Sequence, residues 1–290
     1  MPNGYRDHYF TNADGLRIHY RDYDPVGEVQ GLPVICLHGL TRNVKDFEDI
    51  APRIAKMGRR VISASQRGRG LSDYDPQPER YNPMTYAVDM VLLLDHLGLD
   101  RLVFVGTSMG GLMTMGIAHE QPERLAAVVL NDIGPVLHPD GIGRIKANLT
   151  HRAPVDSWEE AAERSKASNL AAFPKREHDQ DYWIAFAKRL WREGEDGKLH
   201  LAYDAAIIDH LGEDGAPVPD LWPFYEALKD TPTLLVRGGI TDLVTPQTVE
   251  EMKARKPDLR YAEVPDVGHA PMLDEPEAWS AIESLLAAVD

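Results

Sequence analysis

The sequence predicts an α/β protein in which a mostly parallel central sheet carries helices on both faces and a helical cap is inserted late in the chain. Apolar runs without polar alternation, such as residues 33–37 and 102–105, are typical of strands buried in a parallel sheet. Segments with helical spacing alternate with these runs. From 136 to 219 this alternation stops, and several helical segments follow without a clear buried strand. This break predicts the inserted cap.

Each expected element follows from a local pattern. Residues 8–10 and 17–23, joined across Asp14 and Gly15, predict a β-hairpin. Further strands are expected at 33–37, 60–65, 101–105, 126–130, 233–236 and 261–264. Helices are expected at 46–57, 84–97, 108–119, 157–168, 181–191, 247–253 and after Pro276. The chain is therefore expected to divide into a core of residues 1–135 and 220–290 and a cap of residues 136–219.

Composition narrows the class of partner. The chain has 290 residues, and its 46 acidic against 31 basic residues give a net charge of -15. This charge argues against nucleic acid or an anionic membrane as a partner. The lone cysteine, Cys36, lies in an apolar run and cannot form a disulfide within one chain. No apolar run is long enough to span a bilayer and no apolar leader segment is evident, so we expect a cytoplasmic protein.

The motif that organises the chain is Gly106-Thr107-Ser108-Met109-Gly110, a G-x-S-x-G pattern between an apolar strand and a helix. A serine at the apex of such a turn is typical of a nucleophile elbow. The turn holds the serine in a strained conformation, and small neighbours are needed around it. We therefore interpret Ser108 as a catalytic nucleophile.

A serine nucleophile needs a base that is itself oriented by a carboxylate. His269 is the best candidate base, because it follows the last expected strand and lies beside Gly268. Two acids compete for the orienting position. We favour Asp242, which lies in a glycine-rich loop, over Asp132, which follows the strand after the elbow helix and has an alternative structural role in pinning the chain. The predicted catalytic residues are Ser108, Asp242 and His269.

Acyl transfer also needs donors aimed at the developing oxyanion. The backbone N–H groups of Met109 and Leu40 are expected to supply them. His38, Arg67 and Arg69 are interpreted as structural. Candidate substrate-pocket residues are Thr41, Trp222 and Val244, and the mixture of aliphatic and aromatic residues in the cap suggests an apolar pocket. No metal-binding pattern, Walker A motif or dinucleotide fingerprint is present in the sequence, so we expect no metal.

Together these motifs resemble the α/β-hydrolase superfamily. The resemblance rests on His38-Gly39, the Arg67–Ser72 loop, the elbow, Gly239 with Asp242, and Gly268-His269. Residues 37–43 and 130–135 are similar to those of bacterial carboxylesterase-like serine hydrolases with a helical cap. The resemblance implies hydrolysis of a small-molecule carboxylic ester through an acyl-enzyme, with no cofactor. One departure is Ser65, where many relatives carry aspartate, and we expect it to affect loop structure alone.

The fold does not fix the reaction. A serine at the elbow argues against the halide- and epoxide-cleaving members of the fold, which use aspartate there. Lactonases, C–C bond hydrolases and perhydrolases that use the same triad stay open, as does a catalytically silent member that binds a small ligand. The sequence does not predict the oligomeric state.

Overall fold

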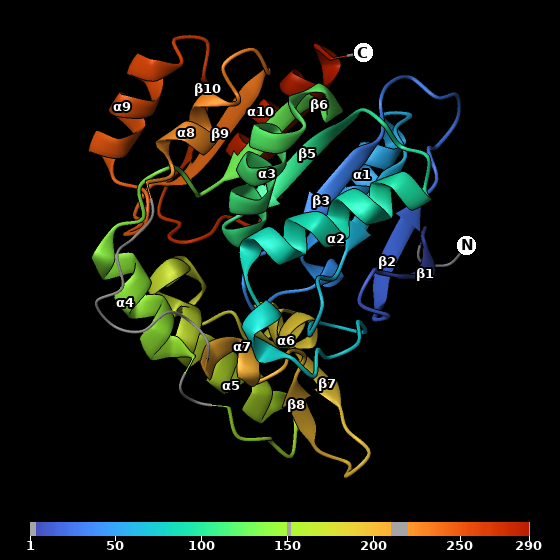
Figure 1. Cartoon of the computed structure of the whole chain (residues 1–290). Helices are drawn as coiled ribbons and strands as arrows, with labels where there is room; N and C mark the ends of the chain where they lie inside the picture. Colours follow the sequence, from blue (N-terminus) through green and yellow to red (C-terminus); the bar gives the residue numbers. More distant parts are fainter. Residues whose placement is uncertain (1–3, 150–151, 210–219, 290) are drawn as a thin grey trace.

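The computed structural model describes residues 4–149, 152–209 and 220–289, and its centre is an eight-stranded sheet (Figure 1). The strand order is β1-β2-β4-β3-β5-β6-β9-β10. The strands are β1 (Arg6–Thr11), β2 (Arg17–Tyr23), β3 (Val34–Leu37), β4 (Val61–Ala64), β5 (Leu102–Thr107), β6 (Leu125–Asn131), β9 (Thr233–Gly238) and β10 (Arg260–Val264).

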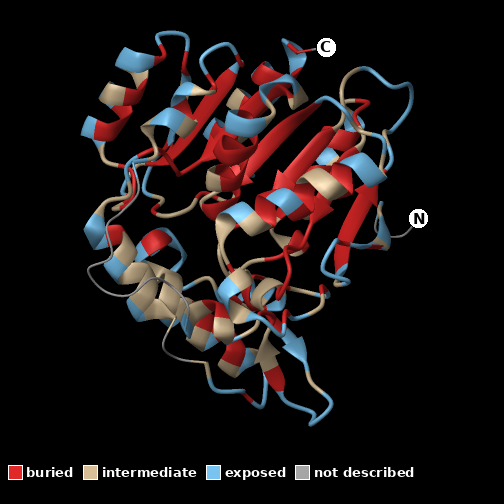
Figure 2. Ribbon diagram, viewed as in Figure 1, coloured by how far each residue is buried: buried red, intermediate tan, exposed pale blue. Residues whose placement is uncertain are grey.

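The sheet is parallel from β4 to β10, and β2 is antiparallel to both of its neighbours. The predicted hairpin forms between β1 and β2, where Gly15 adopts φ +81° and Asn12 Oδ1 accepts the N–H of Leu16 at 2.9 Å. Strands β3, β4 and β6 are buried along their whole length and β5 is buried up to Gly106, as their apolar sequences predict (Figure 2).

Helices cover both faces of the sheet, and each face has its own apolar core. On one face lie α1 (Ala51–Lys56) and α10 (Pro276–Ala287), and on the other α2 (Pro83–His96), α3 (Met109–Glu120), α8 (Trp222–Glu226) and α9 (Pro246–Arg255) (Figure 1). Short 3₁₀ turns occupy η1 (Val44–Phe47), η2 (Pro78–Arg80) and η3 (Pro122–Arg124). Within the described ranges, no helix is both long and apolar enough to cross a membrane.

The helix expected at 46–57 is divided in two. A 3₁₀ turn, η1, begins after Asn43, whose side chain accepts the N–H of Lys45 at 3.0 Å, and α1 begins only at Ala51. Pro52 explains the division, because proline lacks an N–H to continue a helix but fits its first turn. The periodicity of the apolar residues is thus satisfied by two short elements.

Residues 136–149 and 152–209, which we call the cap segment, lie beyond the carboxyl ends of the parallel strands (Figure 1). They form α4 (Pro139–Asn148), α5 (Trp158–Asn169), η4 (Leu170–Ala172), η5 (Pro174–Arg176), α6 (Gln180–Leu190), β7 (Trp191–Glu193), β8 (Leu199–Leu201) and α7 (Ala206–Asp209).

The cap segment has an apolar cluster of its own, in which Trp183, Phe186 and Trp191 pack together. The β7–β8 hairpin was not expected, because strands of three residues are too short to show an alternating pattern. The division of the chain at residues 135 and 220 stays a prediction, and residue 219, the expected end of the cap, lies outside the described residues.

Candidate active site

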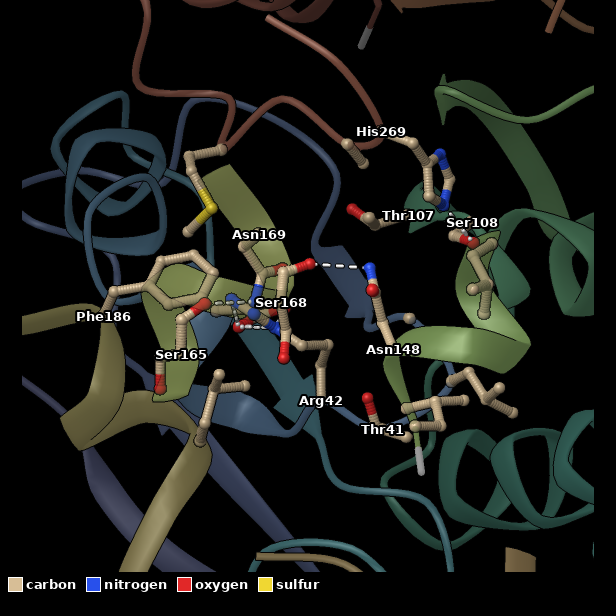
Figure 3. A pocket seen from close by; sticks show the side chains of 18 of the residues that line it. Thr41, Arg42, Thr107, Ser108, Asn148, Ser165, Ser168, Asn169, Phe186 and His269 are labelled. Carbon is tan, nitrogen blue, oxygen red and sulfur yellow. Dashed lines mark hydrogen bonds and ion pairs between the residues drawn. The ribbon is translucent and has the colours of Figure 1, made fainter. Parts of the chain in front are cut away.

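Ser108 occupies the apex of the turn between β5 and α3, with φ 52° and ψ -117°. A positive φ is strained for a residue with a side chain and is characteristic of functional turns. The two motif glycines permit the turn. A Cβ at Gly106 would lie 2.6 Å from Gly110 O, and a Cβ at Gly110 would lie 2.0 Å from Leu37 O. The helix therefore packs directly on the strands, and the Ser108 side chain faces a pocket (Figure 3).

His269, which follows β10, joins Ser108 to a buried carboxylate. Its Nε2 atom lies 2.9 Å from Ser108 Oγ and its Nδ1 atom lies 2.7 Å from Asp132 Oδ2. With the Ser108 hydroxyl donating to Nε2, the Nδ1–H donates to the carboxylate. Figure 3 shows the imidazole of His269 pointing at the Ser108 side chain. This is the geometry of a nucleophile, a base and an orienting acid.

The structure corrects the choice between the two acids, since Asp132 and not Asp242 contacts His269. Asp132 directly follows β6, the strand between β5 and β9, and its side chain is fully buried. Its carboxylate also accepts hydrogen bonds from the Gly238 N–H at 2.9 Å and the Thr241 hydroxyl at 2.6 Å. These donors fix the carboxylate where the Nδ1–H of His269 reaches it.

Asp242 has a different partner. The Arg144 guanidinium, from α4 of the cap segment, donates to both carboxylate oxygens of Asp242, with Nε at 2.6 Å and Nη2 at 2.7 Å. This bidentate pair holds the pKa of Asp242 below its ordinary value. Both acids follow strands in the sequence, but no local pattern indicates the pair with Arg144, because its two residues are 98 positions apart.

Two backbone amides of the segments beside Ser108, those of Leu40 and Met109, have no hydrogen-bond partner in the described chain. Each of these N–H groups shares a peptide group with a carbonyl, of Gly39 or of Ser108, that accepts a hydrogen bond within the protein. Gly39 O accepts from His38 Nδ1 at 2.7 Å, and Ser108 O accepts from the Gly111 N–H at 2.8 Å. Because N–H and C=O point in opposite directions in a trans peptide, both donors are left free to face an oxyanion.

His38 and Arg67 are structural residues, as the sequence analysis expected. The His38 ring is fully buried, accepts the Gln66 N–H on Nε2 at 3.1 Å and carries its own proton on Nδ1. Burial lowers the pKa of His38 to about 3, so the ring is neutral at physiological pH. The buried Arg67 guanidinium forms ion pairs with Asp14, Asp75 and Asp89.

Ser108 and His269 open into a pocket of about 200 Å³ between the sheet and the cap segment. Thr41 lines this pocket, as expected, but Trp222 and Val244 do not. Val244 is fully buried in the core. Trp222 begins α8, and its ring packs against the Arg255 guanidinium at 3.8 Å. Val244 follows the loop of Asp242, and Trp222 follows the expected end of the cap. The side chains of both residues nevertheless pack between the sheet and its helices.

The pocket combines apolar side chains, as the sequence suggested, with polar side chains that the sequence did not indicate. Its cap side carries polar side chains of α4 and α5, including Arg144, Asn148, Arg164, Ser165, Ser168 and Asn169 (Figure 3). Phe186 and Leu190 of α6 supply an apolar portion. The sequence did not indicate these polar residues, because the helical pattern alone does not show which face of each cap helix turns toward the core. Among the described residues, no cluster of potential metal ligands is present.

Comparison with known proteins places this site in a family. A family model described as "alpha/beta hydrolase fold" matches residues 33–276. A 3-hydroxybutyrate-oligomer hydrolase from Cupriavidus necator is 33% identical over 251 residues, which cover 84% of each chain. The sn-1-specific diacylglycerol lipase ABHD11 of Danio rerio is 27% identical over 91% of this chain and 80% of its own. The crystal structure of an α/β hydrolase from Novosphingobium aromaticivorans is 41% identical, with a TM-score of 0.90 over 98% of both chains.

These likenesses agree with the elbow, the strand order and the position of Ser108 at the carboxyl edge of the sheet. The superfamily resemblance and the fold class expected from the sequence are confirmed. The chain belongs to the alpha/beta hydrolase fold family.

Proposed function

We propose that this protein is a serine hydrolase that cleaves carboxylic esters through an acyl-enzyme intermediate. The observation that carries the proposal is the continuous hydrogen-bonded path from Ser108 Oγ through the His269 ring to the Asp132 carboxylate. Such a path makes a hydroxyl nucleophilic at neutral pH.

The reaction has two halves. In the first, Ser108 Oγ attacks the ester carbonyl while His269 Nε2 accepts its proton, and the Leu40 and Met109 amides bind the oxyanion. Collapse of this intermediate breaks the ester C–O bond, and His269 returns the proton to the departing alcohol. In the second half, a water molecule gives a proton to His269 and attacks the acyl carbon. The bond to Ser108 Oγ then breaks, His269 returns the proton to this oxygen, and the carboxylic acid is released. Asp132 stays ionised and orients the imidazole throughout.

Short oligoesters of hydroxy acids are the substrate class that we favour. The Cupriavidus necator relative is named for its action on 3-hydroxybutyrate oligomers, which contain ester bonds and end in a carboxylate. Three arginines, Arg42, Arg144 and Arg164, line the pocket, with Asp46 as the sole carboxylate among its described lining residues. Each guanidinium is held by a carboxylate, in Asp46, Asp242 and Glu160 respectively. Arginines fixed in this way suit recognition of an anionic end group.

The test is a substrate panel with wild-type protein and Ser108→Ala. The panel contains p-nitrophenyl esters of increasing acyl length, the dimer and trimer of 3-hydroxybutyrate, a lactone and a vinylogous diketone. We expect turnover of the esters and of the oligomers, and loss of both in Ser108→Ala. Turnover of the lactone or diketone with inert esters would overturn the ester assignment. Ester turnover that survives Ser108→Ala would overturn the nucleophile.

A further inference from the structure

Arg69 is a buried cation that contacts both residues of the candidate oxyanion hole. Its side chain is fully buried, and among the described residues no carboxylate lies within ion-pair distance of it. The Nε–H donates to Leu40 O at 2.9 Å, Nη1 donates to Arg67 O at 2.8 Å, and Nη2 lies 3.8 Å from Met109 Sδ. The guanidinium carbon lies 4.4 Å from the centre of the Tyr86 ring. The guanidinium thus joins the Leu40 loop to the first residue of α3.

This placement is energetically unusual. Burial of a charge without a directly paired counter-ion is costly, because the charge loses its hydration. Burial lowers the pKa of Arg69, but a guanidinium stays protonated in proteins. The nearby Arg67 is buried against three carboxylates, which shows how the same loop stabilises a cation that serves packing. At Arg69, carbonyl oxygens and aromatic faces take the place of a direct carboxylate partner, and the nearest opposite charge, that of Asp204, acts across the Tyr81 hydroxyl.

The backbone around Arg69 ties this arrangement to the cap segment. The Gly70 N–H donates to Ala202 O at 2.8 Å, and the Asp204 N–H donates to Gly68 O at 2.8 Å. Between these bonds, Arg69 and Tyr203 face each other as an antiparallel bridge. Tyr203 also lines the pocket. The residue that reaches the oxyanion hole is therefore carried on a strand-like pairing with the cap.

We propose that Arg69 is a positioning residue for the oxyanion hole. His38 fixes the peptide group that carries the Leu40 N–H, and Arg69 fixes the next carbonyl, so that Leu40 is held from both sides. Contact with Met109 Sδ holds the second donor residue at a constant separation from the first. Because residues 68–70 pair with residues 202–204 of the cap segment, the separation of the two donors also depends on the position of the cap segment. The inference rests on the ester hydrolysis proposed above.

The decisive variants are Arg69→Met, which removes the charge and the hydrogen bonds, and Arg69→Lys, which keeps the charge but cannot span all three contacts. Loss of a single oxyanion donor lowers kcat by about 10² to 10³. Because the variants loosen donors without removing them, we expect kcat to fall about tenfold to hundredfold while KM changes by less than about threefold. Affinity for a trifluoromethyl ketone, whose Ser108 adduct carries an oxyanion, should fall in parallel with kcat/KM.

Arg59→Met is the matched control. Arg59 is another buried arginine whose guanidinium donates to backbone carbonyls, those of Leu32 and Leu286, at the amino end of the sheet. Its loss is expected to lower the thermal midpoint without changing kcat or ketone affinity. Added guanidinium ion, far below unfolding concentrations, should restore part of kcat in Arg69→Ala, whereas sodium chloride at equal ionic strength should not.

Folded Arg69→Met with kcat/KM and ketone affinity within twofold of wild type would overturn the inference. If Arg69→Met does not fold, Arg69→Lys decides by the same two measurements. A change in KM alone would also contradict the positioning of an oxyanion hole. Wild-type protein that binds the ketone but hydrolyses no ester would instead overturn the proposed function, and the ketone affinities of the Arg69 variants would still test the positioning.

Discussion

His269 Nδ1 lies 2.7 Å from the carboxylate of Asp132, a residue of the loop after β6, whereas the acid of the loop after β9, Asp242, binds Arg144. The two acids thus divide two tasks between them. Asp132 lies beneath the imidazole and is fully buried, and Asp242 connects the core to helix α4 of the cap segment. Loss of the Asp132 charge is therefore expected to lower activity, whereas loss of the Asp242 charge is expected to lower stability.

The first prediction concerns Asp132→Asn. An asparagine keeps the shape of the side chain but favours the wrong tautomer of His269, so we expect kcat to fall by about 10⁴. Asp242→Asn is the matched control, with an expected fall in kcat of less than about tenfold. Steady-state kinetics on one ester checks both. The reverse order of the two effects would show that His269 turns to Asp242 during catalysis.

The second prediction concerns the Asp242–Arg144 pair. Arg144 lowers the pKa of Asp242 in the folded state, so the pair stabilises the protein above the ordinary pKa of an aspartate. That contribution is lost as the pH falls through the folded-state pKa. Both side chains are partly exposed, so the free energy at stake is about 1 kcal/mol or less. Urea unfolding of wild type and Asp242→Asn should differ at neutral pH and converge in acid. A constant difference would contradict this contribution.

The third prediction uses two glycines of α4. A Cβ at Gly141 would lie 2.9 Å from Asp242 O and from Leu243 Cα, whereas a Cβ at Gly143 would meet nothing within 4 Å. Gly141→Ala should displace the helix from the core, destabilise the fold by about 1–3 kcal/mol and raise KM. Gly143→Ala, the control, should stabilise the protein by up to about 1 kcal/mol through helix propensity. Thermal midpoints and KM values distinguish them, and equal effects would refute the close seating of α4.

The fourth prediction concerns His38 and pH. Its folded-state pKa is lowered to about 3 by burial, whereas the unfolded chain binds the proton at the ordinary pKa of 6.5. The unfolded state therefore binds more protons between these values, and stability falls as the pH drops below 6.5. Between pH 7 and pH 5, wild type should lose about 1–2 kcal/mol more than His38→Asn. Urea unfolding at the two pH values checks this, and parallel losses would contradict a neutral buried ring.

Local patterns in the sequence were sufficient for much of the molecule. Uninterrupted apolar runs identified the buried strands, and the two glycines around Ser108 identified the elbow, because close packing of α3 on β5 leaves no room for a Cβ. His269 follows the last strand of the sheet, so its position after an apolar run was enough to bring it to the same edge as Ser108.

Only the tertiary structure decided which acid meets His269. Asp132 and Asp242 both follow strands at that edge, and the choice depends on β6 lying between β5 and β9 and on Arg144, from a distant helix, binding Asp242. The residues that line the pocket were likewise decided by tertiary contacts. Val244 is buried in the core and the partly buried Trp222 packs against it, whereas Arg69, interpreted as merely structural, reaches Leu40 and Met109. Helices and strands follow from the spacing of apolar residues along short stretches of the chain. Contacts between distant side chains depend on how those helices and strands pack.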